Sequence, residues 1–280
     1  MGGSVLSKVR LTQEDFDWFR ELIAREAGIN IANNKHQFVY NRVIRRMQYL
    51  GINSFEEYKK YISLSGDKEE IEKLLEEIVT HETSFFRYRP HFEYFERVIL
   101  KELVSKRAKR GMRSNILSAG CSTGEELYSL AIIIYEKVSP ENRVLFRLNG
   151  FDISRSVIER AREGTFLESE LEELPENYIK NYFVREGNVF RLIPQVQANV
   201  NFYKFNMLHD SWHHFSHSDV IFCRNTLIYL TKVAKEKVLQ NVVGALRDGG
   251  YLVLGHTEII DAESFGLTRV ANTIYRKVRK

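Results

Sequence analysis

Two hydrophobic patterns follow each other along this chain. In the first 80 residues, apolar positions recur every three or four residues, as on one face of a helix. Thr12 followed by Asp15 is typical of a helix start, and Gly28 and Gly51 are typical of helix ends. We expect four helices here, at about 12–28, 35–50, from 54 onward, and 67–79. The last of these is strongly acidic.

After residue 113 the pattern changes to short apolar runs that alternate with helical segments. Strands are expected at about 115–119, 146–152, 200–205, 219–223 and 251–255, and helices at about 125–138, 154–163 and 232–246. This alternation is typical of a parallel sheet with helical crossovers. A basic helix at 101–113 is expected to lead into the first strand.

The segment at about 165–199 does not follow the strand and helix rhythm. Phe190–Ile193 after a turn at 186–188 predicts a small β-hairpin inserted into the sheet domain. The fold class expected is therefore α/β, with a doubly wound Rossmann-like domain at 86–280 that carries this insertion. An all-α domain at 1–85 precedes it.

Composition narrows the classes of protein only a little. The chain has 280 residues, 44% hydrophobic and 28% charged, which is ordinary for a folded protein. A net charge of +4 is too small to argue for nucleic acid. The longest apolar run, 130–135, is too short to span a membrane, and the first eight residues lack the features of a signal peptide. We expect a cytoplasmic protein that does not insert into a membrane.

The most informative stretch is Leu117–Glu126, where a glycine-containing turn joins a buried strand to a helix. Such a turn lets a ligand approach the backbone at the carboxyl end of a sheet. The stretch has neither the G-x-G-x-x-G pattern of a dinucleotide site nor a P-loop, and Glu125 and Glu126 would repel a phosphate. A cationic or zwitterionic ligand fits better.

Asp152 ends the second expected strand. A carboxylate there can accept both hydroxyl groups of a ribose, and the alternative role is an N-cap for the helix that starts near Ser154. A carboxylate after the second strand and a glycine loop after the first indicate an adenosine-type ligand. Without phosphate chemistry, S-adenosylmethionine is favoured over NAD.

Several separated motifs resemble those of the chemotaxis receptor methyltransferases, the CheR family. The resemblance runs in the expected order from about residue 11 to 260. The stretches that carry it are Val39–Arg46, Thr83–Arg87, Ser118–Glu126, Ile221–Asn225, Ile228–Tyr229 and Gly255–Glu258. This sequence departs from the family where His81 replaces a common asparagine, Leu127 a common proline, and Thr226-Leu227 a more usual Val-Met pair.

The resemblance implies transfer of a methyl group from S-adenosylmethionine to glutamate side chains of transmembrane chemoreceptors, with S-adenosylhomocysteine as product. Arg87 and Tyr229 fall at positions near the reacting groups. The positions that line the cofactor in the family correspond to His81, Thr83, Arg87, Gly120, Glu126, Asp152, Asn206, Met207, Arg224 and Asn225. Asp152 would bind the ribose, and Asn206 and Met207 would flank the adenine.

A run without acidic residues, from 27 to 55, contains Arg42, Arg45 and Arg46 on one helix. Glutamate-rich receptor helices would be attracted to such a face, and the resemblance makes it a candidate substrate-binding surface. A merely solvated helix face is the alternative. The aromatic residues that single-strand nucleic-acid binders interleave with basic ones are absent there.

Other functions stay open at this point. His209–His217 holds four histidines but no H-E-x-x-H pattern or cysteine pair, so no metal site is expected. A methyltransferase of the same fold with another substrate, or a non-catalytic sensor of S-adenosylmethionine, would carry the same cofactor motifs. Family members that dock a receptor's C-terminal tether peptide on the insertion tend to have a longer hairpin loop. The short turn at Arg185–Asn188 therefore predicts no dependence on a tether.

Overall fold

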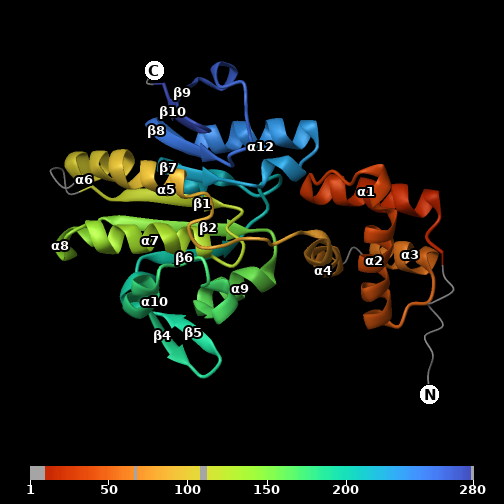
Figure 1. Cartoon of the computed structure of the whole chain (residues 1–280). Coiled ribbons are helices and arrows are strands. Elements are labelled where there is room, and N and C mark those ends of the chain that lie inside the picture. The colour runs from red at the N-terminus through yellow and green to blue at the C-terminus, as the bar shows by residue number, and fades with distance from the viewer. Residues whose placement is uncertain (1–9, 66–67, 108–111, 279–280) are drawn as a thin grey trace. The chain divides into compact units, whose positions relative to one another are not determined.

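Residues 10–65, 68–107 and 112–278 are described by the computed structural model, and they form two units. One unit contains the chain up to Thr80 together with a returning segment, Tyr229–Lys235. The other contains His81–Ile228 and Glu236–Lys280. The elements of each unit are labelled in Figure 1.

The N-terminal unit is helical. Its helices are α1 (Gln13–Ala27), α2 (His36–Leu50), α3 (Phe55–Ser65) and α4 (Lys68–Ile78), with a short 3₁₀ turn at Asn33–Lys35. Helix α1 starts with a capping box, in which Asp15 N donates to Thr12 Oγ1 at 3.1 Å and Thr12 N donates to Asp15 Oδ2 at 3.2 Å. Gly28 and Gly51 end α1 and α2 with φ of 71° and 70°. The expected helices are confirmed within two residues at most ends.

The returning segment joins this unit through main-chain hydrogen bonds. Asn30 N donates to Tyr229 O at 2.7 Å, and Thr231 N donates to Gly28 O at 2.8 Å. The apolar faces of the helices meet in a core whose fully buried members include Phe16, Phe19, Ile23, Val39, Val43, Met47, Tyr58 and Leu74.

The second unit is built on a seven-stranded sheet of order β6-β2-β1-β7-β8-β10-β9. Its strands are β1 (Ser114–Ala119), β2 (Phe146–Asp152), β6 (Val200–Lys204), β7 (Ser218–Cys223), β8 (Leu246–Leu254), β9 (Leu267–Ala271) and β10 (Ile274–Lys277). The five strands from β6 to β8 are parallel, and β10 and β9 are antiparallel additions. This confirms the doubly wound α/β prediction, and the strand order reverses between β1 and β7.

Helices cover this sheet. They are α5 (Arg89–Tyr94), which continues through a π-helical stretch (Phe95–Leu100) into α6 (Lys101–Arg107), then α7 (Glu125–Lys137), α8 (Pro140–Arg143), α9 (Arg155–Glu163) and α12 (Lys232–Ala245). Helices α7 and α9 pack against β2 and β6, and Figure 1 shows α7 and α12 running along the sheet. The continuous buried face of α7 explains its nearly uniform apolar sequence.

The insertion forms a second, three-stranded antiparallel sheet of order β3-β5-β4. It comprises β3 (Thr165–Leu167), α10 (Glu176–Tyr182), β4 (Phe183–Glu186), β5 (Val189–Leu192) and α11 (Pro194–Gln197). The predicted hairpin is β4 and β5, joined by a turn at Gly187 and Asn188. The third strand was not predicted, because three residues are too few to show alternation.

Other elements also differ from the sequence-based expectation. Strands β9 and β10 and helix α5 were not predicted. Of the helix expected at 101–113, the structure describes α6, Lys101–Arg107, and residues 108–111 lie outside the described residues. Strand β8 begins at Leu246, five residues earlier than expected, and runs through a left-handed Gly249 with φ of 74°. Gly249 and Gly250 predicted a turn in the sequence, because glycine is uncommon in the interior of a strand.

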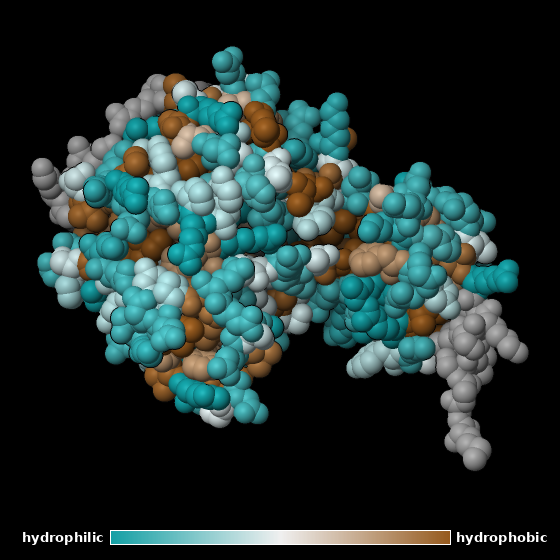
Figure 2. All heavy atoms as spheres, viewed as in Figure 1, coloured by the Kyte–Doolittle hydropathy of each residue, from teal (hydrophilic) through white to brown (hydrophobic). Residues whose placement is uncertain are grey.

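The face seen in Figure 2 is mostly hydrophilic, with small separate hydrophobic patches. Within the described ranges no helix is both long enough and apolar enough to cross a bilayer.

Candidate active site

Most of the residues predicted for the cofactor lie where parallel strands end. Gly120 follows β1, Asp152 ends β2, Asn206 follows β6, and Arg224 and Asn225 follow β7. Because these strands are parallel neighbours, their carboxyl ends meet at one edge of the sheet. The reversal of strand order between β1 and β7 is where ligands bind in open α/β sheets.

The loop after β1 is tightly built around Gly120. Gly120 N and Cys121 N both donate to Phe151 O at 2.9 Å, which holds the loop against β2. The φ of Gly120 is 78°, and a Cβ there would lie 2.6 Å from Thr226 Oγ1 in the loop after β7. Only glycine fits between the two loops at this point.

Asp152 lies at the centre of the next group of contacts. Its Oδ2 accepts from Ser122 N at 3.0 Å and its Oδ1 accepts from Ser154 N at 3.1 Å. Burial raises the pKa of this carboxyl, and the nearby His81 opposes that rise. The N-cap of α9 is Ser154, whose Oγ accepts from Val157 N, so Asp152 is not the cap. Both Asp152 oxygens retain a lone pair for another donor, as a ribose diol requires.

His81 belongs to the same group. Its carbonyl accepts from Ser122 Oγ at 3.1 Å, while its buried Nε2 has no hydrogen-bond partner. Ser122, which has a φ of 50°, was not among the predicted site residues. Its position between Gly120 and Gly124, in the loop after the first strand, is the sequence signal that could have identified it. An orphaned ring nitrogen beside a buried carboxylate fits a polar ligand at this edge.

Glu126 and Arg224 are brought together as a buried ion pair. Arg224 Nη1 lies 2.9 Å from Glu126 Oε2, and their side chains are only 2% and 13% exposed. Glu126 Oε1 accepts from Ser118 Oγ at 2.7 Å, and Arg224 Nη2 donates to Arg87 O. The pair thus connects β1, α7, the loop after β7 and the segment before α5. Arg224 Nε is buried without a partner.

The loop after β6 packs on aromatic rings. Asn206 Oδ1 accepts from Leu208 N at 2.9 Å, and Met207 O accepts from Trp212 Nε1 at 3.1 Å. Phe151, Phe205 and Trp212 pack on one another with ring centroids 4.5–5.4 Å apart. Asn206 and Met207 are therefore held beside an apolar wall of the kind that a planar ring can pack against.

The two predicted catalytic residues, Arg87 and Tyr229, belong to different units. Arg87 is half-buried, with Nη1 donating to Glu82 O at 2.7 Å. It is flanked by Phe86 and Tyr88, which both have positive φ. Thr83 is half-buried nearby in the chain. Tyr229 is 44% exposed and belongs to the returning segment of the N-terminal unit.

We call Arg42, Arg45 and Arg46 of α2 the arginine face. No acidic residue lies near these arginines in the sequence, but the fold brings acidic side chains of α4 to them. Arg46 forms a bidentate pair with Glu70 of α4, at 3.0 and 2.7 Å, and Tyr58 OH donates to the same carboxylate at 2.7 Å. Arg46 is therefore held by the buried Glu70 carboxylate of α4, although no acidic residue lies near it in the sequence. Arg42 and Arg45 lie 3.9 and 3.3 Å from Glu77 and remain 33% and 50% exposed.

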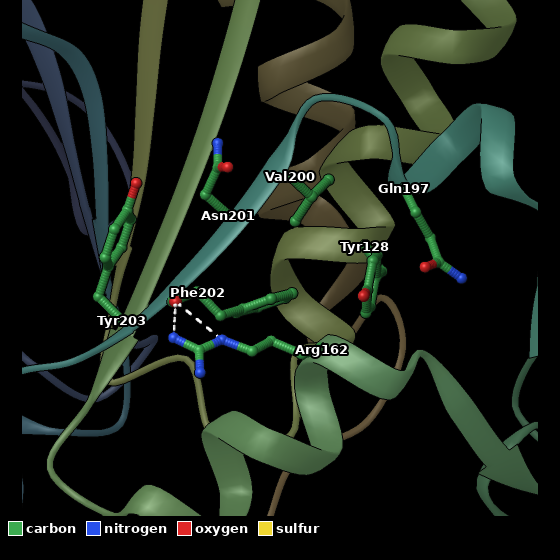
Figure 3. A pocket seen from close by; sticks show the side chains of 7 residues that line it. All are labelled: Tyr128, Arg162, Gln197, Val200, Asn201, Phe202 and Tyr203. Atoms are coloured by element: carbon green, nitrogen blue, oxygen red, sulfur yellow. Dashed lines mark hydrogen bonds between the residues drawn. The ribbon is translucent and has the colours of Figure 1, made fainter.

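A cavity of about 230 Å³ lies away from these groups, at the outer edge of the sheet. Figure 3 shows it beside β6, with Arg162 of α9 donating to Phe202 O at 2.6 and 3.2 Å. None of the residues predicted for the cofactor lines it. Arg162 covers an open strand edge, which is a common way to prevent unwanted strand pairing.

The histidines at 209–217 are not arranged as a metal site. In the described parts of the chain, no group of three or more His, Cys, Asp and Glu side chains is placed to hold a metal ion. The ring of His214 packs against Tyr203 and Phe215. These contacts place the His214 ring in a cluster with the rings of Tyr203 and Phe215.

Two family models match this chain. The model described as CheR methyltransferase, SAM binding domain, matches residues 81–275, and that described as CheR methyltransferase, all-alpha domain, matches residues 14–79. Together they cover both units and meet close to the division between Thr80 and His81.

Curated relatives match over nearly the whole length. Chemotaxis protein methyltransferase 2 of Pseudomonas aeruginosa is 32% identical, over 94% of this chain and 93% of its own. Chemotaxis protein methyltransferase of Klebsiella aerogenes is 32% identical, over 98% of this chain and 94% of its own. The protein of that name from Escherichia coli is 30% identical, over 96% and 92% of the two chains.

Proposed function

This chain belongs to the CheR methyltransferase family, and from that we propose that it transfers the methyl group of S-adenosylmethionine to glutamate side chains of chemoreceptors. The observation that carries the proposal is the match of both family models, together with relatives named chemotaxis protein methyltransferase over nearly the full length. The product would be a glutamyl methyl ester, and the enzyme a protein-glutamate O-methyltransferase. It would act in the cytoplasm on the helical methylation region of the receptor.

The residues at the carboxyl edge of the sheet suit this cofactor. Asp152 offers two carboxylate oxygens, and His81 Nε2 and Arg224 Nε are buried polar atoms without partners. Gly120 keeps the loop after β1 free of a side chain that would block the backbone. We assign the cofactor to His81, Thr83, Arg87, Gly120, Glu126, Asp152, Asn206, Met207, Arg224 and Asn225. When bound, S-adenosylmethionine supplies a methyl group activated by its sulfonium sulfur.

The chemistry needs orientation more than proton transfer. A glutamate side chain, with an ordinary pKa of about 4.3, is ionised at neutral pH, so no base has to activate it. The role of the protein is to hold the carboxylate in line with the methyl group and to exclude water. Arg87 can bind a carboxylate with two N–H groups, and the Tyr229 hydroxyl can donate to one. We assign these two residues to orientation of the reacting groups.

We assign receptor recognition to the N-terminal unit. Arg42 and Arg45 are exposed enough to attract a glutamate-rich helix. Arg46 contributes by holding α2 to α4 through Glu70. The two roles are separable because the Arg46 pair is buried and the other two arginines are not.

We also propose that the enzyme does not depend on a receptor tether peptide. The turn between β4 and β5 has only Gly187 and Asn188 between the strand ends, so the hairpin offers little surface beyond the sheet itself. Isothermal titration with peptides from receptor C-termini should show no tight binding. Submicromolar binding that is lost when Phe190 is replaced by Ala would contradict this.

The function is tested by measuring transfer of labelled methyl from S-adenosylmethionine to a cytoplasmic chemoreceptor fragment. Label on glutamates that is released by mild base identifies an ester. Asp152→Ala and Arg87→Ala should each lower kcat/KM by about a hundredfold or more, a loss of about 2.7 kcal/mol of transition-state stabilisation. Arg147→Ala, an exposed position on β2, is the control and should not change it.

Two outcomes would separate the parts of this proposal. If S-adenosylhomocysteine binds but no receptor fragment is labelled, the cofactor assignment stands and the substrate is a different one. If Asp152→Ala binds and transfers normally, the site assignment is wrong.

A further inference from the structure

Glu258 joins two loops at the carboxyl edge of the sheet. It lies just after β8 and is 1% exposed. Its Oε2 accepts from Gly255 N at 2.7 Å and from Asn225 N at 2.9 Å. Its Oε1 accepts from Thr226 N at 3.1 Å and from Ile228 N at 3.2 Å. One carboxylate therefore satisfies four backbone donors, three of which belong to the loop after β7.

That loop needs an external partner to keep its shape. Asn225 has a φ of 55°, a left-handed conformation that asparagine tolerates, and its N–H points to the Glu258 carboxylate. Buried N–H groups without acceptors are costly, so loss of the carboxylate would favour another loop conformation. Glu258 and Asn225 also pack closely against Gly255. A Cβ on Gly255 would lie 2.7 Å from Glu258 Oε2 and 2.9 Å from Asn225 N.

The conformation of this loop determines the positions of two proposed cofactor residues, Arg224 and Asn225. Arg224 sends its guanidinium back to Glu126 and to Arg87 O, and that direction depends on the backbone at 224–226. The same loop presents Thr226 Oγ1 next to Gly120. A shift here would therefore change the loops after β1 and β7 together.

We propose that Glu258 is a positioning residue for S-adenosylmethionine. It holds the 224–228 loop in the conformation that binds the cofactor, and it acts through the backbone of that loop. This inference rests on the assignment of the cofactor to this edge of the sheet and does not depend on the receptor as substrate. Glutamine is the informative replacement, because it keeps the shape but offers one oxygen acceptor and turns an NH₂ group toward two N–H donors.

The test compares Glu258→Gln with Glu263→Gln, which removes the same charge at an exposed position five residues later. Isothermal titration with S-adenosylhomocysteine should show the Kd rising about tenfold or more in Glu258→Gln and unchanged in Glu263→Gln. The KM for S-adenosylmethionine should rise by the same factor. The KM for the receptor fragment should not change, whereas general damage to the protein would alter both.

Hydrogen–deuterium exchange gives a second readout that needs no substrate. In the unmodified protein without ligand, the amides of Asn225, Thr226, Ile228 and Gly255 should be protected. In Glu258→Gln, peptides that span 224–228 and 255 should exchange faster, while β1 and β7 stay protected. Unchanged Kd in Glu258→Gln would overturn the proposal. So would rapid exchange at these amides in the unmodified protein, or loss of the circular dichroism of the folded state in the variant, because the effect proposed is confined to one loop.

Discussion

The cofactor edge of the sheet and the arginine face of α2 both depend on charged side chains, but they use them differently. At the sheet edge the carboxylates of Asp152 and Glu258 are buried and that of Glu126 is 13% exposed. They accept from backbone N–H groups, a hydroxyl and one buried guanidinium. On α2, Arg42 and Arg45 share one half-buried carboxylate, that of Glu77, at longer distances.

The charges at the sheet edge hold the cofactor loops in place, whereas those on α2 attract an oppositely charged partner. A buried charge with fixed partners holds loops in place, and its removal leaves a partner unsatisfied in a medium of low dielectric constant. An exposed charge contributes little to stability, but it attracts an oppositely charged partner over a distance that salt shortens. Changes at the sheet edge should therefore affect folding and cofactor binding, and changes on α2 should affect receptor affinity.

The strongest test of this contrast replaces one arginine in each region. Arg224→Met leaves the Glu126 carboxylate, which is only 13% exposed, without its charged partner, so the free energy of unfolding should fall by about 3–5 kcal/mol. Arg45→Met removes an exposed pair with Glu77 and should lower it by less than about 1 kcal/mol. Urea denaturation of both variants measures the difference, and equal losses would mean that burial does not distinguish the two pairs.

A second test uses the pH dependence of the buried region. Burial, and then the positive charge of Arg224, lowers the pKa of His91 to about 3. The unfolded chain binds a proton near the ordinary pKa of about 6.5 and the folded chain does not, so this stability is present above 6.5 and is lost as the pH falls toward 3. His91 should account for a loss of about 2 kcal/mol between pH 8 and pH 5.

The measurement is the free energy of unfolding of the unmodified protein and of His91→Gln across this pH range. The variant should lose less stability on acidification. His213→Gln, at an exposed position, is the control and should follow the unmodified protein. Parallel curves for all three proteins would rule out a neutral buried His91.

The third test concerns attraction on α2. Replacing Arg42 and Arg45 together by Glu should raise the KM for a receptor fragment about tenfold at low salt, or about 1.4 kcal/mol, while leaving the Kd for S-adenosylhomocysteine unchanged. Lys60→Glu with Lys73→Glu makes the same charge change elsewhere in the N-terminal unit and should have a much smaller effect. An effect that does not shrink as salt is added would argue against electrostatic attraction.

The smallest expected effect comes from Glu77. This carboxylate lies where a receptor glutamate would have to bind Arg42 and Arg45, so Glu77→Gln should lower the receptor KM about twofold. Glu69→Gln, also exposed on α4, is the matched control and should leave the KM unchanged. A higher KM in Glu77→Gln would show that the carboxylate supports the recognition surface rather than competing for it.

Local patterns were enough to predict most of the architecture. The helical spacing before residue 80 and the alternating runs after 113 predicted the four N-terminal helices and all five parallel strands, because amphipathic periodicity is a property of neighbouring residues. The short strand β3, the antiparallel pair β9 and β10, and the extension of β8 through Gly249 were missed. These elements are short or interrupted by glycine, and their own residues carry little periodic signal.

The candidate site likewise contains residues that the sequence identified and contacts that it did not. Gly120 and Asp152 were identifiable because a loop after a strand has a recognisable composition, and the family motifs added the remaining positions. The ion pairing of Arg46 with Glu70 was not visible, because the two residues lie 24 positions apart on different helices. The four donors gathered by Glu258 come from positions up to 33 residues away.

The sequence by itself determined the four N-terminal helices, the five parallel strands and the residue types that stand at their ends. Only the tertiary structure decided which charges are buried together. Hydrophobic periodicity can be recognised from residues that are close together in the sequence. The energy of a charged group depends instead on the partners and the dielectric surroundings that the whole fold brings to it. Arg46 and Arg45 are neighbours in the sequence, yet one is fixed inside the helical unit and the other faces solvent.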